Sequence, residues 1–430
     1  MRKLFATILM CFGIFLLGGF QSRAAEEDKL IIVIDPGHGG GNFGAHYEGF
    51  WEKNITLKVA NAMYDRLSMF EGVEVHMTRY EDKGLSLKKR ATIARGLEAD
   101  FVISLHFNAS ESHMNYGTEC WIPFDNYYEE SYILASYITD ELTGLGLYDR
   151  GVKTRVNDEG DNYYGIIRES EKLSMPCVLV EHCHMDHERD IPAYNSDEKL
   201  KQMGILDADA VAKCFGLKSE QLGVDYSDMV SDIYVPLSES TRDKTGPSEC
   251  AITVKQYNKE TGEVIVILTA REEESRLLYY TYSIDGGDTY SQYYPLTSES
   301  VQFSFTVGED DPEPILIARA YSLYESYTES DLIDFEYSTF PEVYIPEKTE
   351  EIDEEIDTED VPAMSVVVDD ESPKQPSETQ KMKTFLLLVS IILFICFFVI
   401  LTFGIVRAIY KKKLKKKATD KAEEDESQNG

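Results

Sequence analysis

Three polar side chains with catalytic potential follow apolar, strand-like runs in the first half of the chain. They are His38, in the glycine-rich turn after residues 30–34, His106 and Glu181. In open α/β sheets, functional groups collect at the carboxyl ends of the strands. We therefore expect these three residues to converge in space although they are far apart in the sequence.

Two imidazoles and one carboxylate are the usual protein ligands of a catalytic zinc ion, which keeps a further position for water. Glu52, fourteen residues after His38 at the start of a predicted helix, is the candidate for the carboxylate ligand. Glu181 would then stay uncoordinated and act as the base that takes a proton from the attacking water. From these residues alone, a structural hydrogen-bonding role for each histidine stays open.

Four short segments around these residues resemble the signature segments of a known family. In order and in separation they are similar to those of the zinc-dependent N-acetylmuramoyl-L-alanine amidases, and the resemblance covers roughly residues 30–217. The four segments are Ile34–Gly40, Trp51–Asn54, Ser104–Ala109 and Val178–Glu181. Together they are specific, whereas any one of them alone would be a weak signal.

The resemblance implies a role for each candidate residue. It implies that His38, Glu52 and His106 bind one Zn²⁺, that Glu181 is the catalytic carboxylate, and that no organic cofactor is needed. The implied substrate is peptidoglycan. The bond cut would be the amide that joins the lactyl group of N-acetylmuramic acid to L-alanine of the stem peptide.

Four further polar residues near these segments could support the site. Arg79 and Arg90 lie at family-like positions, and we interpret both as structural rather than catalytic residues. Asp35 or Asn108 could orient a ligand imidazole, as outer partners of metal sites do. The more ordinary role of these two side chains is to hold loops through backbone hydrogen bonds.

The sequence departs from the family pattern directly after Glu181, where His182, Cys183, His184 and His187 follow. Three histidines and a thiol could bind a second metal ion. Alternating residues of a strand point to opposite faces, however, so these side chains are not expected to meet at one ion. We favour a structural interpretation, with His182 or His184 lining the substrate groove.

The elements that would position these residues alternate between strand-like and helix-like periodicity over residues 25–220. This alternation predicts an α/β domain whose sheet has helices on both faces. The predicted strands are Leu30–Ile34, Val73–Thr78, Phe101–Leu105, Glu119–Ile122, Gly165–Ile167 and Val178–Val180, and the predicted helices are Asn54–Met69, Leu87–Leu97, Glu129–Leu145 and Glu198–Cys214.

After a polar connector over residues 221–246, the pattern changes to short alternating runs separated by turn signals. Runs of this kind without helices predict a small all-β sandwich over residues 247–342. The predicted strands are Ala251–Tyr257, Glu263–Leu268, Leu278–Ser283, Val301–Thr306 and Ile315–Tyr321.

Both ends of the chain carry targeting features. Residues 1–24 are predicted to be a signal peptide, with an uncleaved anchor as the alternative. Residues 343–384 form an acidic, disordered spacer, and residues 385–406 form a transmembrane helix because 22 residues carry no charge. The basic start of residues 407–430 places this tail in the cytoplasm. We therefore expect a single-pass protein of the cell membrane with an extracytoplasmic catalytic domain.

The composition narrows the possible partners. The chain has 77 acidic and 42 basic side chains and a net charge of −35, so nucleic acid is excluded as a partner. The same acidity argues against a purely electrostatic grip on anionic wall polymers. Five of the seven cysteines lie between the predicted signal peptide and the transmembrane helix. Because five is odd, at least one of these thiols must stay free.

Together these features predict a membrane-tethered zinc amidase that acts on peptidoglycan. The alternative is a non-catalytic peptidoglycan-binding sensor, or a division or sporulation scaffold, whose sandwich binds a protein partner that the sequence does not identify. The segment between Asn108 and Glu181 has no long insertion that would cover the site. We therefore expect the site to be accessible.

Overall fold

The computed structural model describes residues 29–229, 231–236, 244–308 and 311–335. The predicted signal peptide, acidic spacer, transmembrane helix and cytoplasmic tail lie outside these residues, so they stay predictions. Within the described part of the chain, no helix has both the length and the apolar character needed to cross a membrane.

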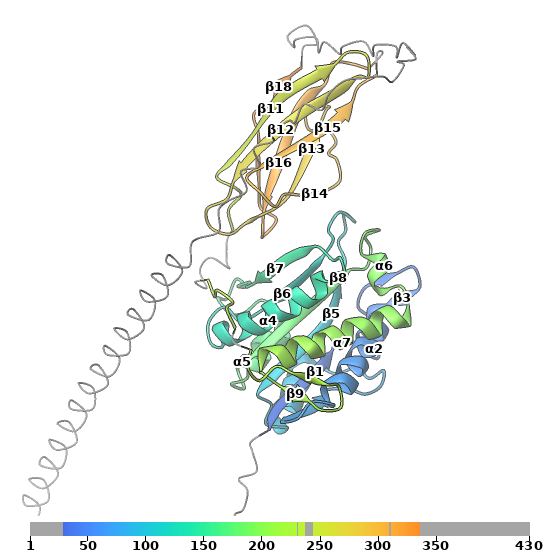
Figure 1. Cartoon of the computed structure of the whole chain (residues 1–430), viewed down its shortest axis with the longest axis vertical. Coiled ribbons are helices and arrows are strands. Elements are labelled where there is room, and N and C mark those ends of the chain that lie inside the picture. Colours follow the sequence, from blue (N-terminus) through green and yellow to red (C-terminus); the bar gives the residue numbers. More distant parts are fainter. Residues whose placement is uncertain (1–28, 230, 237–243, 309–310, 336–430) are drawn as a thin grey trace, which may run out of the picture. The chain divides into compact units, whose positions relative to one another are not determined.

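A six-stranded mixed sheet forms the centre of the catalytic domain, in the order β4-β1-β5-β8-β6-β7 (Figure 1). Four neighbouring strands run parallel, and β6 runs antiparallel to β8. The strands are β1 (Leu30–Pro36), β4 (Val73–Met77), β5 (Phe101–Asn108), β6 (Thr118–Trp121), β7 (Asp149–Lys153) and β8 (Cys177–His184). The predicted α/β class of this domain is confirmed.

Helices cover both faces of this sheet. The first layer consists of α2 (Glu52–Leu67), α4 (Tyr128–Thr143) and α7 (Asp197–Cys214), and α2 and α7 lie side by side (Figure 1). The second layer consists of α3 (Leu87–Gly96) and α5 (Gly165–Glu171).

Strand β1 shows how the sheet separates these two layers. Ile32 and Ile34 belong to the hydrophobic core under the first layer, whereas Val33 packs with Ala91 and Ile166 of the second layer. Successive side chains of a strand point to opposite faces, so a run of apolar residues fills both cores.

Shorter elements complete the domain. They are the hairpin of β2 (His46–Tyr47) and β3 (Phe50–Trp51), the turn of helix α6 (Ile191–Tyr194), and the hairpin of β9 (Lys218–Ser219) and β10 (Val224–Asp225). Strand β10 lies inside the predicted polar connector, which therefore begins as part of the catalytic domain.

One prediction of local structure was wrong, and one strand was missed. The run Gly165–Ile167 is not a strand but the start of helix α5, where Ile166, Ile167 and Ser170 are buried against α3 and the sheet. A short apolar run cannot distinguish a buried strand from a buried helical turn. Strand β7 was missed because its sequence, Asp-Arg-Gly-Val-Lys, contains a single apolar residue.

The second domain has two antiparallel sheets, as predicted for a sandwich. One has the order β11-β12-β15 and the other β14-β13-β16-β17, with β18 also pairing with β16. The strands are β11 (Glu249–Asn258), β12 (Glu263–Arg271), β13 (Leu277–Ser283), β14 (Tyr294–Pro295), β15 (Ser300–Thr306), β16 (Ile315–Ser322), β17 (Tyr327–Glu329) and β18 (Ile333–Asp334). All five predicted strands of this domain are confirmed.

A cluster of tyrosines joins the sandwich to the catalytic domain, and the described residues fall within one compact unit. The Tyr279 hydroxyl donates to the Tyr116 carbonyl at 2.6 Å, and the Tyr148 hydroxyl donates to the Leu278 carbonyl at 2.6 Å. Tyr116 and Tyr279 are 2% and 0% exposed. The contact between the domains is therefore a packed core rather than a loose linker.

Candidate active site

His38 is held by the turn that follows β1. Its φ angle of 60° lies in the left-handed region, and Gly39 and Asn42 close the turn through two backbone hydrogen bonds. The His38 Nδ1 lies 2.9 Å from the Asn42 side-chain oxygen. Because an amide oxygen only accepts, Nδ1 carries the proton and Nε2 is left to face the site.

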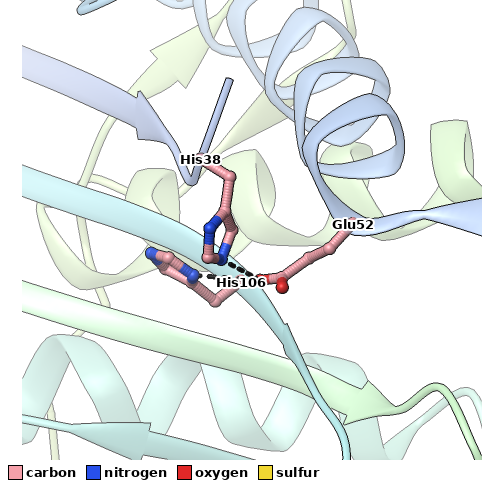
Figure 2. A group of neighbouring side chains, drawn as sticks. All are labelled: His38, Glu52 and His106. Carbon is pink, nitrogen blue, oxygen red and sulfur yellow. Dashed lines mark hydrogen bonds and ion pairs between the residues drawn. The ribbon is translucent and has the colours of Figure 1, made fainter. Parts of the chain in front are cut away.

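Glu52 begins α2 and gathers the two histidines around one oxygen atom (Figure 2). Its Oε1 lies 2.9 Å from Nε2 of His38 and 3.0 Å from Nδ1 of His106. Its Oε2 accepts a hydrogen bond from the backbone N–H of Ala45 at 2.8 Å. Burial alone would raise the pKa of Glu52, but the hydrogen bonds from His106 and His38 lower it. The carboxylate therefore stays ionised and able to bind a cation.

The donor set fits a zinc ion. The ligand atoms of His38, Glu52 and His106 lie within 4.8 Å of one another, and they form the only such metal-binding group among the described residues. Two glycines make this convergence possible, because a Cβ atom at Gly37 would lie 2.5 Å from His106 and one at Gly44 would lie 2.3 Å from Glu52. Two imidazoles and one carboxylate are donors that zinc accepts in catalytic sites.

Glu181 lies directly beside this group on the neighbouring strand. In the register of β5 and β8, Glu181 pairs with His106. Its Oε2 is buried, and among the described residues it has no hydrogen-bond partner. Burial, and then the nearby carboxylates of Glu52 and Glu119, raise the pKa of Glu181 well above its usual range. An unpartnered carboxyl that readily holds a proton is suited to transfer one during a reaction.

Arg79 and Arg90 have the structural role expected of them. Arg90 forms a buried ion pair with Asp35 at 2.8 Å and donates to the carbonyls of Pro36 and His38. Arg79 donates to the carbonyls of Pro36 and Gly37 at 3.0 and 2.7 Å. Both guanidinium groups thus fix the loop that carries His38.

The side chain that orients the candidate ligand His38 is Asn42, not Asp35 or Asn108. Asp35 accepts hydrogen bonds from Thr78, Ser104 and Arg90, and Asn108 donates to Glu119 at 3.0 Å. The spacing of Asn42, four residues after His38 across a glycine-rich turn, was the available signal in the sequence.

The histidines after Glu181 do not form a second metal site among the described residues. His182 is buried and lies between the His106 carbonyl at 3.0 Å and the Asp207 carboxylate at 2.9 Å. His184 is also buried and faces the Gly117 carbonyl. Cys183 is a free, buried thiol, and the other four cysteines of the described part are free as well. The hydrogen bonds of the buried His182 and His184 side chains within the fold support the structural interpretation of these two residues.

Two pockets lie near the candidate site, one lined by His38 and His106 and the other by Glu119, the strand partner of Glu181. The first, here called the metal-side pocket, has a volume of about 620 Å³ and is lined by His38, His106, Ser86, Arg168 and other residues. The second, here called the junction pocket, has a volume of about 550 Å³ and is lined by residues of both domains, with Glu119 and His184 among them. His184 lines the junction pocket, whereas His182 lines neither of the two pockets.

A mixed α/β domain with a His/Glu/His group and a buried carboxyl beside it has the arrangement of a metal-dependent hydrolase. A family model described as N-acetylmuramoyl-L-alanine amidase matches residues 32–213. The chain therefore belongs to the N-acetylmuramoyl-L-alanine amidase family, and the arrangement of its candidate site agrees with this assignment.

Individual proteins are similar over the same part of the chain. The uncharacterized protein YqiI of Bacillus subtilis (strain 168) is 34% identical over 200 residues, which cover 46% of this chain and 91% of that protein. The sporulation-specific N-acetylmuramoyl-L-alanine amidase of the same organism is 30% identical over 188 residues, covering 44% and 69%. The solved structure of Cwp6 from Clostridium difficile shares 31% identity at a TM-score of 0.41, covering 43% and 29%.

Proposed function

We propose that this chain is a membrane-tethered zinc hydrolase that cleaves the amide bond between N-acetylmuramic acid and L-alanine in peptidoglycan. The observation that carries the proposal is the convergence of His38, Glu52 and His106 on one point, with the unpartnered Glu181 carboxyl in register beside it. The family to which the chain belongs supports the same reaction.

The roles of the residues follow from their positions. His38, Glu52 and His106 would hold the zinc ion, which when bound supplies Lewis acidity toward the amide carbonyl and water. Glu181 accepts a proton from the attacking water and returns it to the leaving nitrogen of L-alanine. A C–O bond forms at the lactyl carbonyl and the C–N bond breaks, giving a lactyl carboxylate and a free amine.

The membrane tether is a second part of the proposal, and its support comes from the sequence alone. Residues 385–406 carry no charge and are followed by Arg407 and six lysines. Such a segment spans a bilayer with its basic end in the cytoplasm. The catalytic domain would then act in the part of the wall closest to the membrane. A chain truncated after residue 384 should leave the membrane fraction, and its continued retention there would contradict the tether.

The reaction can be tested with the full-length, zinc-loaded protein and purified peptidoglycan. We expect mass spectrometry to find stem peptides with a free L-alanine amino terminus, and we expect a chelator to stop their release until zinc is restored. New reducing sugar ends, or cuts within the peptide, would contradict the assigned bond. Binding of peptidoglycan without turnover under any metal would instead favour the non-catalytic sensor or scaffold.

A further inference from the structure

The junction pocket lies close enough to the candidate active site to take part of the same substrate. Glu181 in β8 pairs with His106 on one side and with Glu119 in β6 on the other. Adjacent strands are about 4.8 Å apart, so Glu119 in the junction pocket lies about 10 Å across the sheet from His106. An extended peptide covers this distance with about three residues.

The fixed charges at the base of the pocket cancel one another. Glu119 accepts from Lys153 at 2.7 Å and from Arg150 at 3.1 Å, and Arg150 also pairs with Glu325 of the sandwich. Arg150 and Lys153 are each 1% exposed and Glu119 is 2% exposed, whereas the Glu325 side chain is 36% exposed, so this network of two anions and two cations is buried except at Glu325. Because the two positive and two negative charges balance, this network has no net charge with which to bind an ionic ligand.

Two cations at the pocket lining are not cancelled in this way. Arg155 and Lys244 line the pocket, and neither forms an ion pair among the described residues. The Arg155 guanidinium instead stacks over the ring of Tyr163 at 3.8 Å, which leaves its N–H groups free to bind an anion. In a chain with a net charge of −35, a pocket with two such cations points to an anionic ligand.

The sandwich supplies one wall of this pocket and is held firmly in place. The Tyr324 hydroxyl accepts a hydrogen bond from the Thr154 N–H at 3.2 Å, and Asn115 donates to Glu325 at 3.2 Å. The Ser326 hydroxyl donates to the Lys244 carbonyl at 3.3 Å, so the β16–β17 turn also positions Lys244.

We propose that the junction pocket binds a carboxylate of the stem peptide between Arg155 and Lys244, about three residues from the scissile amide. The sandwich is then part of the substrate site rather than a spacer. This inference rests on the proposed function, because it places the amide bond at the group formed by His38, Glu52 and His106. A carboxylate is the anion that a peptide, rather than the uncharged glycan, offers at this distance.

The test uses two muropeptides that differ only in whether the peptide carboxylates are free or amidated. For the full-length, zinc-loaded protein, we expect kcat/KM to be roughly tenfold or more higher for the free acid, as charge-assisted hydrogen bonds allow. The double variant Arg155→Gln with Lys244→Gln should bring this ratio close to one. Lys244→Gln alone, at an exposed coil residue where misfolding is not expected, should lower the ratio partly.

The matched control is Arg271→Gln with Lys255→Gln, which removes two exposed cations of the sandwich strands and should keep the ratio. A wild-type ratio near one, or a ratio unchanged in the double variant, would overturn the inference while the amidase reaction stands. If neither muropeptide is cleaved, the proposed function fails instead. In that case calorimetry tests the inference by measuring the affinity of the protein for the free and the amidated stem peptide. Tighter binding of the free acid would support the inference, and equal affinity for the two peptides would overturn it.

Discussion

Two carboxylates that face each other across neighbouring strands have opposite environments in this molecule. Glu181 in β8 and Glu119 in β6 are register partners, yet Glu181 has a buried oxygen without a partner while Glu119 accepts hydrogen bonds from Arg150, Lys153, Asn108 and Trp121. Burial raises the pKa of both groups, and for Glu119 the cations Lys153 and Arg150 reverse the direction and lower it.

The difference shows how two neighbouring carboxylates of one sheet can have different roles, Glu181 as the candidate proton-transfer group and Glu119 as a structural ion-pair partner. Like charges on directly opposed residues destabilise a strand pair. The two buried cations pair with Glu119 and keep it ionised, while Glu181 has no such partner and still feels the negative charges of Glu52 and Glu119. Glu181 keeps a raised pKa, which suits the proton transfer proposed for it, and Glu119 links the catalytic domain to the sandwich through Arg150.

The largest expected effect comes from removing the carboxyl of Glu181, the candidate catalytic member of this pair. Glu181→Gln keeps the shape of the side chain but cannot accept and return a proton, so kcat should fall roughly 10²–10⁴-fold. Zinc content measured on the purified variant should match the wild type, because Glu181 is not in the metal-binding group.

Glu188→Gln is the matched control, because Glu188 is an exposed residue seven positions later. It should leave kcat unchanged. A Glu181→Gln variant that retains wild-type turnover would show that another group transfers the proton.

Removing the carboxyl of Glu119, the structural member of the pair, should lower the free energy of unfolding instead. Glu119→Gln leaves Lys153 and Arg150 buried with one anion fewer, and breaking a buried ion pair in this way costs about 3–5 kcal/mol. The free energy of unfolding from urea titration measures this loss. Glu74→Gln, which affects only the partly exposed pair with His76, should change it by less than about 1 kcal/mol. Equal losses in the two variants would contradict the structural role of Glu119.

The same contrast explains which parts of the site could be predicted from the sequence. His38, His106 and Glu181 follow apolar runs, and a parallel sheet brings the ends of such strands together, so their convergence was predictable. The network on Glu119 was not predictable. Arg150 and Lys153 lie in β7, whose single apolar residue gives no strand signal.

The contacts between the two domains could not be predicted from the sequence either. The sandwich strands alternate clearly, so their existence was predictable, but the partner of Arg150 is Glu325, which is 175 residues away. No local pattern encodes a pairing at that separation. The tyrosines that pack between the domains have the β-strand preference of any aromatic residue, so their position at an interface was not distinguishable.

A smaller effect is expected when the link between the domains is weakened. Tyr279→Phe removes the hydrogen bond that Arg150 donates at 3.0 Å and the one donated to the Tyr116 carbonyl at 2.6 Å. Unsatisfied buried polar groups cost about 1–3 kcal/mol each, and Arg150 keeps its ion pairs with Glu119 and Glu325. We therefore expect a total loss near the lower end of the sum, roughly 2–3 kcal/mol in the free energy of unfolding. Tyr234→Phe, at a residue that is 81% exposed, is the control and should be neutral. Equal stability of both variants would mean that these two bonds do not hold the domains together.

The smallest expected effect is a dependence of stability on pH that comes from His184. Burial, and then the nearby Arg150, lower the pKa of His184 to about 3. In the unfolded chain a histidine has a pKa near 6.5, so as the pH falls below about 6.5 the unfolded state takes up a proton that the folded state does not. This group therefore lowers stability by about 2 kcal/mol between pH 7 and pH 5. Urea titrations of His184→Gln should show a loss over this range that is smaller than in the wild type by this amount. An identical slope in both proteins would mean that His184 is protonated in the folded state, next to the buried cation of Arg150.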